Sequence, residues 1–512
     1  MKTGTAVSCA GALLACVVGP ASAAGKTCES LTSLSLPTTQ ITSAQSVAAG
    51  GFTLPQSNPA RGGGPGARFD DLPAFCRVAA TIAPSDDSDI KIEVWMPAAG
   101  WNGKFEAVGN GGWSGAISYG PLATALRRGY ATASTDTGHS GARASFALGH
   151  PEKLIDFAYR AVHEMTVQAK AIATAFYGEA PKLSYWNGCS SGGKQGLKEA
   201  QRFPADYDGI IAGAPANYWT HLMAGGVWTG QATLKDPVSH VPPDKYALIH
   251  RAVLDACDAS DGVKDGVLED PARCRFDPNA LKCSGDEGPS CLTAPQVEAV
   301  KKIYAGPSNP RIATRIFPGL EPGSELGWAA MAGGPQPFPI TADHFRFIVF
   351  KDASWDFRTL DFDRDVTLAD RLDDGLLNAI DPDLKPFFGR GGKLLLYHGW
   401  SDQLIAPQNT INYFTSVEAA SGGAEKVKDS ARLFMAPGMA HCGGGDGPNT
   451  FDALSALEQW VEHKNPPDRI IASHSTDGKV DRTRPLCTYP QVARYTGSGS
   501  TDEASNFVCT AQ

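Results

Sequence analysis

The sequence lacks several features that would point to a membrane protein, a nucleic-acid binder or a zinc-binding domain. Beyond its N-terminal region, no apolar run reaches the roughly 18 residues that a membrane-spanning helix needs. Positive charge is not in excess: 45 Lys and Arg residues face 54 Asp and Glu residues, a formal net charge of −9. This balance argues against nucleic acid or an anionic membrane surface as a partner. The absence of Cys-x-x-Cys pairs and of histidine clusters at zinc spacing argues against structural zinc.

Internal repeats and long low-complexity tracts are also absent. What is present fits a large globular enzyme rather than a binding tail. A chain of 512 residues can bury a sizeable core, and its 56 glycines and 36 prolines indicate many turns and loops.

The N-terminus has the pattern of a secretory signal peptide. Met1-Lys2 precedes a mostly apolar run over 6–18, and Ala21-Ser22-Ala23 offers an Ala-x-Ala cleavage site. We therefore predict that residues 1–23 are a signal peptide and that the mature protein is secreted or periplasmic. A lipoprotein signal ending at Cys16 is a weaker alternative, because the apolar stretch before that cysteine is short.

Ten of the twelve cysteines lie outside the predicted signal peptide. An even number in an exported chain suggests five disulfides and no leftover thiol. The sequence alone does not give their connectivity. Closeness in sequence favours Cys257–Cys274, Cys283–Cys291 and Cys487–Cys509, which leaves Cys28–Cys76 and Cys189–Cys442.

The order of predicted elements indicates an α/β core that is interrupted by an insertion. Strands are predicted at 90–96, 104–109, 130–134, 182–187, 393–397 and 431–436, and helices at 154–176 and 194–201. The stretch between about 216 and 378 differs, being rich in Pro, Gly, Asp and Cys with short helices. We divide the mature chain into a first core part (24–215), an inserted domain (216–378) and a second core part (379–512).

A Gly-x-Ser-x-Gly motif at 188–192 supplies the candidate nucleophile, Ser190. The motif alone is weak, because about 0.4 matches are expected by chance in a chain of this composition. Here it follows a predicted strand and opens a predicted helix, the context that exposes a serine Oγ in a sharp turn. The alternative is a glycine-rich turn with an idle serine.

Asp402 and His441 complete a candidate triad in the chain order Ser, Asp, His. Each follows the end of a predicted strand, where the functional groups of open α/β sheets gather. In this prediction His441 takes the proton of Ser190 and Asp402 orients the imidazole. The oxyanion hole is predicted to use the N–H of Ser191 and a second donor at Gly111 or Gly112.

These motifs resemble the tannase and feruloyl esterase family. The resemblance rests on Trp186–Gln195, Ser401-Asp402 and His441-Cys442, supported by Asp136–His139 and Gly209–Ala216. It implies an α/β-hydrolase core, a lid formed by the inserted domain, cleavage of aromatic carboxylic esters, and a disulfide joining Cys189 to Cys442. Ser191 and Lys194 depart from the family pattern, which often has Thr and Arg there.

A second motif, Cys257–Val267, carries three carboxylates within eight residues among glycine turns. Such groups can converge on a hard cation, although a solvated Asp/Gly turn explains the spacing equally well. The resemblance implies a structural Ca²⁺ in the lid. Its ligands would be the side chains of Asp258, Asp261 and Asp265 and the carbonyls of Val263 and Val267, in a loop closed by Cys257–Cys274.

The substrate is the least determined feature. We predict a feruloyl, other hydroxycinnamoyl or galloyl ester of a small alcohol, a plant polysaccharide or a tannin. One alternative is mono-hydroxyethyl terephthalate or a similar half-ester, whose carboxylate Arg346 or Arg358 would bind. Another is a calcium-stabilised ligand-binding module with an inactive triad. His139 and His398 are further candidates to line the pocket. Several aromatic residues of the lid could stack on a planar acid or form the core of the lid: Trp219, Trp228, Trp328, Phe338, Phe345, Phe347, Trp355 and Phe357.

Overall fold

A nine-stranded sheet forms the centre of the computed structural model, which describes residues 1–4, 25–55 and 68–511. Most of the predicted signal peptide lies outside the described residues. The strand order is β1-β2-β3-β5-β4-β6-β7-β8-β9; β1, β2, β3 and β5 pair antiparallel in turn, and all pairs from β5 to β9 are parallel. The strands are β1 (Thr39–Val47), β2 (Phe75–Ile82), β3 (Ile90–Pro97), β4 (Lys104–Val108), β5 (Ala131–Thr135), β6 (Leu183–Cys189), β7 (Gly209–Gly213), β8 (Lys393–Gly399) and β9 (Ala431–Ala436).

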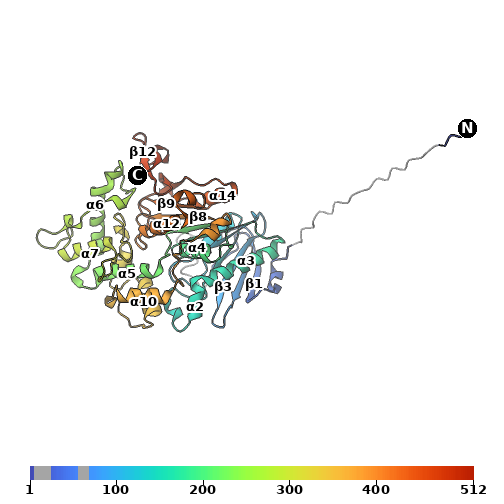
Figure 1. Cartoon of the computed structure of the whole chain (residues 1–512), viewed down its shortest axis with the longest axis horizontal. Helices are drawn as coiled ribbons and strands as arrows, with labels where there is room; N and C mark the ends of the chain where they lie inside the picture. Colours follow the sequence, from blue (N-terminus) through green and yellow to red (C-terminus); the bar gives the residue numbers. More distant parts are fainter. Residues whose placement is uncertain (5–24, 56–67, 512) are drawn as a thin grey trace.

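Helices cover both faces of this sheet (Figure 1). α1 (Tyr119–Arg127) and α14 (Ala453–His463) pack on one face, and α3 (Ala161–Tyr177), α4 (Ser191–Arg202) and α12 (Pro407–Ser421) pack on the other. Successive strand residues therefore enter different cores: Leu394 packs with α3, α4 and α12, whereas Leu395 packs with α14. Burial on both faces explains the continuous apolar run of β8. The α/β fold class is confirmed.

The strand predicted at 90–96 is observed as β3, which is buried at every position except Lys91. Glu93 is therefore a charge inside the fold. Its carboxylate accepts hydrogen bonds from Arg77 Nε at 2.9 Å, Trp95 Nε1 at 2.8 Å and Tyr119 Oη at 2.7 Å. A buried charge with this many donors is tolerated where an unpaired one is not.

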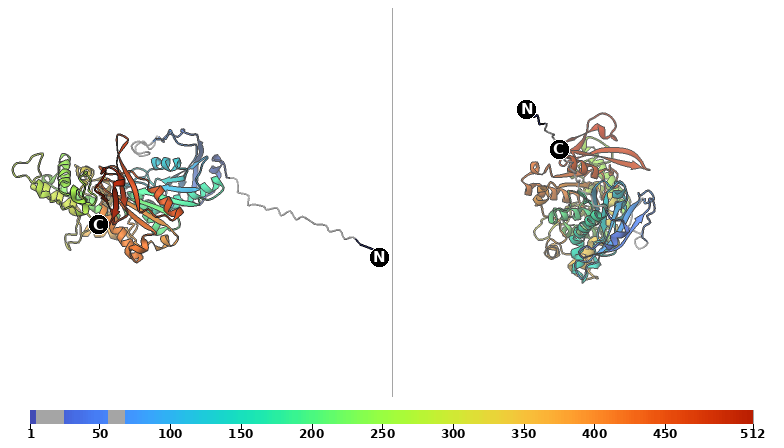
Figure 2. Two further views of the ribbon diagram at one scale, coloured as in Figure 1. Left: turned by 90° about the horizontal axis from the view of Figure 1, so that it is seen from above. Right: turned by 90° about the vertical axis from the view of Figure 1, so that its right-hand side faces the viewer.

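The segment 214–392, between β7 and β8, contains helices but no strand of the sheet. Its longer helices form a block beside the sheet in both Figure 1 and Figure 2. They are α5 (Trp219–Leu234), α6 (Tyr246–Cys257), α7 (Ala294–Ala305) and α10 (Arg364–Asp373), with the shorter α8 (Ala329–Ala332), α9 (Pro339–Asp343) and α11 (Lys385–Gly389). The block has an apolar cluster of its own around Trp328, and a second cluster around Trp219 joins the block to core residues such as Trp113 and Phe157. The predicted insertion falls within this segment.

Two hairpins end the chain, β10 (Arg469–Thr476) with β11 (Lys479–Cys487), and β12 (Val492–Tyr495) with β13 (Phe507–Thr510). The remaining α-helices of the described residues are the short α2 (Pro151–Ile155) and α13 (Ala424–Val427). All five predicted disulfides are present. Within the described residues, no helix is long and apolar enough to cross a lipid bilayer.

Candidate active site

Ser190 lies in the sharp turn between β6 and α4. Its backbone has φ +64° and ψ −124°, a conformation that residues other than glycine seldom adopt, and its N–H donates to the Gly213 carbonyl at 3.0 Å. The turn depends on glycine, because a Cβ on Gly188 would lie 2.5 Å from the Gly192 carbonyl oxygen. This strained turn has the form of a nucleophile elbow.

Asp402 and His441 follow β8 and β9, so both lie at the carboxyl edge of the sheet beside Ser190. His441 Nδ1 donates to Asp402 Oδ2 at 2.7 Å. His398 Nε2 donates to the same oxygen at 3.0 Å, and the N–H groups of Leu404 and Ile405 donate to Oδ1 at 2.8 and 2.9 Å. Asp402 is thereby fixed in one orientation toward His441.

The charges of this pair shift both pKa values. Burial alone would raise the pKa of Asp402, but His441 and His398 outweigh it and hold that pKa well below its usual range. Burial would lower the pKa of His441, and the adjacent Asp402 carboxylate reverses this effect and raises it. Asp402 therefore stays ionised and keeps the His441 proton on Nδ1, which leaves Nε2 as the basic nitrogen.

The Cys189–Cys442 disulfide brings the serine and the histidine together. The two cysteines are 253 residues apart in sequence, and their Cα atoms are 6.0 Å apart. Ser190 and His441, their immediate neighbours, line one pocket of about 40 Å³. Among the described residues, no hydrogen bond joins Ser190 Oγ to His441, as is common before substrate binds.

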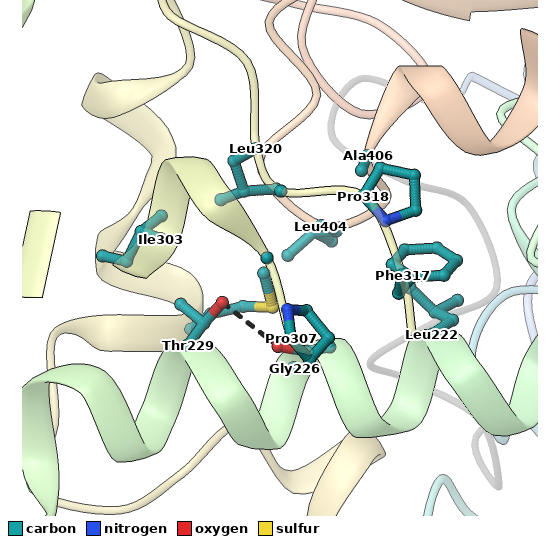
Figure 3. A pocket seen from close by; sticks show the side chains of 14 residues that line it. Leu222, Gly226, Thr229, Ile303, Pro307, Phe317, Pro318, Leu320, Leu404 and Ala406 are labelled. Carbon is teal, nitrogen blue, oxygen red and sulfur yellow. Dashed lines mark hydrogen bonds between the residues drawn. The ribbon is translucent and has the colours of Figure 1, made fainter. Parts of the chain in front are cut away.

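Side chains of the core and of the inserted segment enclose this pocket, and most of them are apolar. The lining consists of Gly112, Ser190, Ser191, Ala216, Trp219, Leu222, Met223, Phe338, Ile340, Thr341, Leu404, Ile405 and His441. A neighbouring pocket between α5 and α7 shares Leu222 and Leu404 with it (Figure 3). That second space measures only about 10 Å³, too little for more than a water molecule. The pocket at Ser190 is the larger of these two adjoining spaces, and it contains the candidate nucleophile.

The predicted oxyanion residues lie beside the nucleophile. Ser191 is the first residue of α4, so its N–H has no acceptor within the helix. Its hydroxyl donates to the Gly112 carbonyl at 2.9 Å, which joins α4 to the turn that follows β4. Gln195 strengthens this junction, since its Oε1 accepts from Asn110 N at 3.1 Å and its Nε2 donates to Asn110 Oδ1 at 3.2 Å.

Comparison with known proteins identifies the family. A family model described as tannase and feruloyl esterase matches residues 76–510. The chain belongs to the tannase and feruloyl esterase family. An uncharacterised esterase from Xanthomonas campestris is 40% identical, over 95% of this chain and 91% of that protein. A probable feruloyl esterase B-1 from Aspergillus flavus is 35% identical, over 85% of this chain and 86% of that protein.

Solved structures agree with this assignment. Feruloyl esterase B from Aspergillus oryzae superposes with a TM-score of 0.89 at 31% identity, covering 94% of this chain and 99% of that one. A tannin acyl hydrolase from Aspergillus niger shares the fold with a TM-score of 0.77 at 23% identity. The protein described here is therefore a carboxylic ester hydrolase with the α/β-hydrolase fold of its family.

Four predicted pocket candidates lie outside the pocket lining of this esterase. His139 bonds the Trp113 carbonyl and stacks on Phe146, and Arg358 pairs with Asp356. Arg346 donates to the Trp355 carbonyl. His398 is fully buried behind Asp402, so it contacts the triad rather than the pocket. Of the predicted lid aromatics, Trp219 and Phe338 reach the lining.

The family-atypical Lys194 lies in the first turns of α4. Its ammonium is fully buried 4.9 Å from the ring centre of Trp219 and 4.7 Å from that of Phe157, and burial lowers its pKa to about 7. Lys194 supports the pocket wall through Trp219, which itself lines the pocket. Ser191, the other departure, makes the Gly112 contact that a threonine hydroxyl would also make.

The predicted calcium loop of the esterase packs against its C-terminal hairpins. Asp258 accepts from Gly266 N at 2.9 Å, Asp261 accepts from Val263 N at 2.9 Å, and Asp265 pairs with Arg484. The oxygens of these three carboxylates do not all lie within 4.8 Å of one another. Glu269, which follows the loop, is buried with its Oε2 atom 3.6 Å from Arg484 Nη1, and burial raises its pKa to about 8 despite this arginine.

Sequence reasoning did not identify several residues of the site. Leu222, Met223, Ile340, Leu404 and Ile405 were not predicted for the pocket, because they come from separate loops and helices and have no motif of their own. The sequence also gave no role to Gln195 or Asn110. Both residues lie within or next to segments that belong to the predicted motifs, and this proximity was the one sequence feature that could have identified them.

Proposed function

We propose that this esterase hydrolyses esters of planar aromatic acids through an acyl-enzyme on Ser190. The observation that carries the proposal is the arrangement around one apolar pocket: Ser190 in a strained turn, and His441 oriented by a buried, ionised Asp402. Each group has the role that nucleophilic ester hydrolysis requires.

In the proposed reaction, His441 Nε2 removes the proton from Ser190 Oγ as the oxygen attacks the ester carbonyl. The carbonyl oxygen becomes an oxyanion and accepts hydrogen bonds from the N–H of Ser191 and from the Gly111–Gly112 turn. His441 then gives its proton to the departing alcohol oxygen, and the acyl group remains on Ser190. A water molecule, deprotonated by His441, repeats the attack and releases the acid and the free serine.

The pocket lining favours a hydroxycinnamoyl acyl group over a galloyl group. Apart from the triad and oxyanion residues, Thr341 is the hydroxyl-bearing side chain in the lining, which suits a planar ring with few polar substituents. A terephthalate half-ester would bring a carboxylate into the same space. No Arg or Lys belongs to the described lining, and Arg346 and Arg358 point elsewhere, so that alternative is disfavoured.

A kinetic panel tests this choice. We expect kcat/KM to fall in the order methyl ferulate, methyl gallate, mono-hydroxyethyl terephthalate. A Thr341→Val variant keeps the volume and removes the hydroxyl, so it separates recognition of ring substituents from loss of fold. Preferred turnover of the half-ester contradicts the substrate proposal. Absence of turnover with all three esters favours the ligand-binding module with an inactive triad.

We also propose that the protein acts outside the cytoplasm, either secreted or periplasmic. The signal-peptide pattern at 1–23 and the five disulfides support this location, since disulfides persist in oxidising compartments. The intact mass of protein from the periplasm or medium should correspond to a chain that begins near residue 24. A mass that retains residues 1–23 in an otherwise active exported protein would contradict the signal assignment.

Finally, we propose that the 258–267 loop binds a structural Ca²⁺. The donor chemistry fits, because Asp258, Asp261 and Asp265 are gathered in one loop with buried Glu269 next to it. Arg484 already contacts Asp265, so a cation would share that carboxylate with an arginine. EDTA dialysis should lower Tm and added Ca²⁺ should restore it, with Asp258→Asn insensitive to both. An unchanged Tm in the wild type would mean that the loop binds no Ca²⁺ and that Arg484 alone offsets its negative charge.

A further inference from the structure

A second group of titratable side chains lies at the far end of α4, away from Ser190. His163 on α3, Glu199 on α4 and Asp206 in the turn before β7 each place one ligand-capable atom within 4.8 Å of the other two. Among the described residues this is the one such group of three. Glu199 follows Ser191 by eight residues, which is about 12 Å along the helix.

Glu199 is the unusual member of this cluster. Its residue is 1% exposed, and neither carboxylate oxygen has a hydrogen-bond partner among the described residues. A buried carboxyl group without donors is costly, so a group of this kind requires either a bound proton or a bound cation.

Within the cluster, the Asp206 carboxylate contacts His163, whereas the Glu199 oxygens have no hydrogen-bond partner among the described residues. His163 Nδ1 contacts Asp206 Oδ2 at 2.6 Å, and Lys170 Nζ donates to the backbone carbonyl of Asp206 rather than to its carboxylate. The His163 side chain is 28% exposed, so solvent reaches the cluster from that side.

We propose that His163, Glu199 and Asp206 bind a divalent transition-metal ion, with Zn²⁺ as the best match. One imidazole nitrogen and two carboxylate oxygens form a ligand set that zinc accepts, with solvent in the fourth position. Calcium and magnesium prefer oxygen ligands alone, so the imidazole discriminates against them. The ligands come from three separate elements, which is why no zinc spacing is visible in the sequence.

Metal binding would bring one oxygen of Glu199, one oxygen of Asp206 and one ring nitrogen of His163 onto the ion. It would replace the present contact of 2.6 Å between His163 Nδ1 and Asp206 Oδ2. The metal ties α3, α4 and the turn after α4 together, so its role is structural and independent of the proposed esterase reaction.

Thermal denaturation with zinc chloride tests this site. After EDTA dialysis and with Ca²⁺ restored, Zn²⁺ at about 100 times its Kd should raise the wild-type Tm by about 2–3 °C. Glu199→Gln should abolish this rise. The Tm of this variant is measured with and without Zn²⁺, so that a stability change caused by the substitution itself is separated from the response to the metal. His474→Gln is the matched control, since His474 pairs with Asp481 on the surface, and it should respond like the wild type.

Cobalt substitution provides a direct readout that does not depend on stability. Co²⁺ should produce visible absorption bands in the wild type that both Glu199→Gln and His163→Gln lose. His163→Gln keeps the test valid if the buried Glu199 variant fails to fold. A wild type with neither a Tm rise nor cobalt bands overturns the proposal. So does a Glu199→Gln or His163→Gln variant that keeps the wild-type response.

Discussion

Four N–H groups converge on Asp402, two from histidines and two from the backbone. The sequence predicted Asp402 and His441 from their positions after two strands, but it did not predict that His398 would support the aspartate. That role depends on how the turn after β8 folds back, which a single sequence does not reveal. His398 is fully buried, with Nδ1 accepting from Thr410 Oγ1 at 2.7 Å. It acts as a positioning residue for Asp402.

The acid limb of the pH profile should report His441. Because only the neutral imidazole is a base and Asp402 raises its pKa, kcat/KM should fall as pH drops through a value above the 6.5 of free histidine. Asp402→Asn should reduce kcat by about 10⁴-fold and move the limb to lower pH, since the raising charge is lost. The control Asp481→Asn removes the aspartate of a surface His–Asp pair. An acid limb at the same pH in Asp402→Asn as in the wild type would contradict the assignment of this limb to His441.

At the scale of elements, α4 connects the chemistry to the rest of the fold. Its first turn supplies Ser191, and Gln195 on its second turn holds the loop after β4 through Asn110. The sequence predicted this helix and the central strands β3 to β6, β8 and β9, because apolar runs and flanking turns mark them. It did not predict β1, whose TQITSAQSV sequence is largely polar, or β7, which is five residues long.

The helix predicted at 154–176 is observed as three consecutive pieces. α2 leads into a π-helical turn, Asp156–Arg160, and then into α3. Apolar spacing predicted a helical segment but not the wider turn, where Asp156 bonds Arg160 Nε at 2.6 Å. The C-terminal hairpins were also not predicted, since polar residues interrupt the apolar pattern of β10 and β11.

Loss of the Gln195 contacts should impair the transition state more than binding. Gln195→Met keeps the volume but leaves Asn110 without its donor and acceptor, so the oxyanion turn loses its support. We expect kcat to fall by up to about 10²-fold with little change in KM. Gln201→Met is the matched control on the same helix, because Gln201 contacts Tyr413 instead. Equal kcat and KM values in the two variants would show that Gln195 does not position the oxyanion turn.

At the scale of the molecule, the inserted segment separates β7 from β8, and one disulfide joins the two parts of the core on either side of it. Cys189 precedes the nucleophile and Cys442 follows the base, so the covalent link crosses the whole inserted segment. Cysteine count and closeness predicted the five pairs. The aliphatic part of the pocket lining was not predicted, because tertiary packing brings α5, α9 and the loop after β8 to one place.

Removal of this disulfide should lower activity before it unfolds the protein. In a Cys189→Ala/Cys442→Ala double variant, Ser190 and His441 lose their shared anchor, and kcat should fall at temperatures where the fold persists. Chain-entropy arguments put the stability loss at up to about 5 kcal/mol. The control Cys487→Ala/Cys509→Ala removes a disulfide from the terminal hairpins and should keep its turnover. Unchanged turnover in the first double variant would refute the role of the bridge.

Covalent labelling of Ser190 tests the central claim most directly. The wild-type protein is incubated with an alkyl fluorophosphonate, and its intact mass and tryptic peptides are measured. The arrangement of Ser190, His441 and Asp402 predicts one adduct per chain, located on Ser190 and absent from Ser190→Ala, with Ser191→Ala still labelled. A wild-type protein that gains no mass, or an adduct on another residue, would contradict the account.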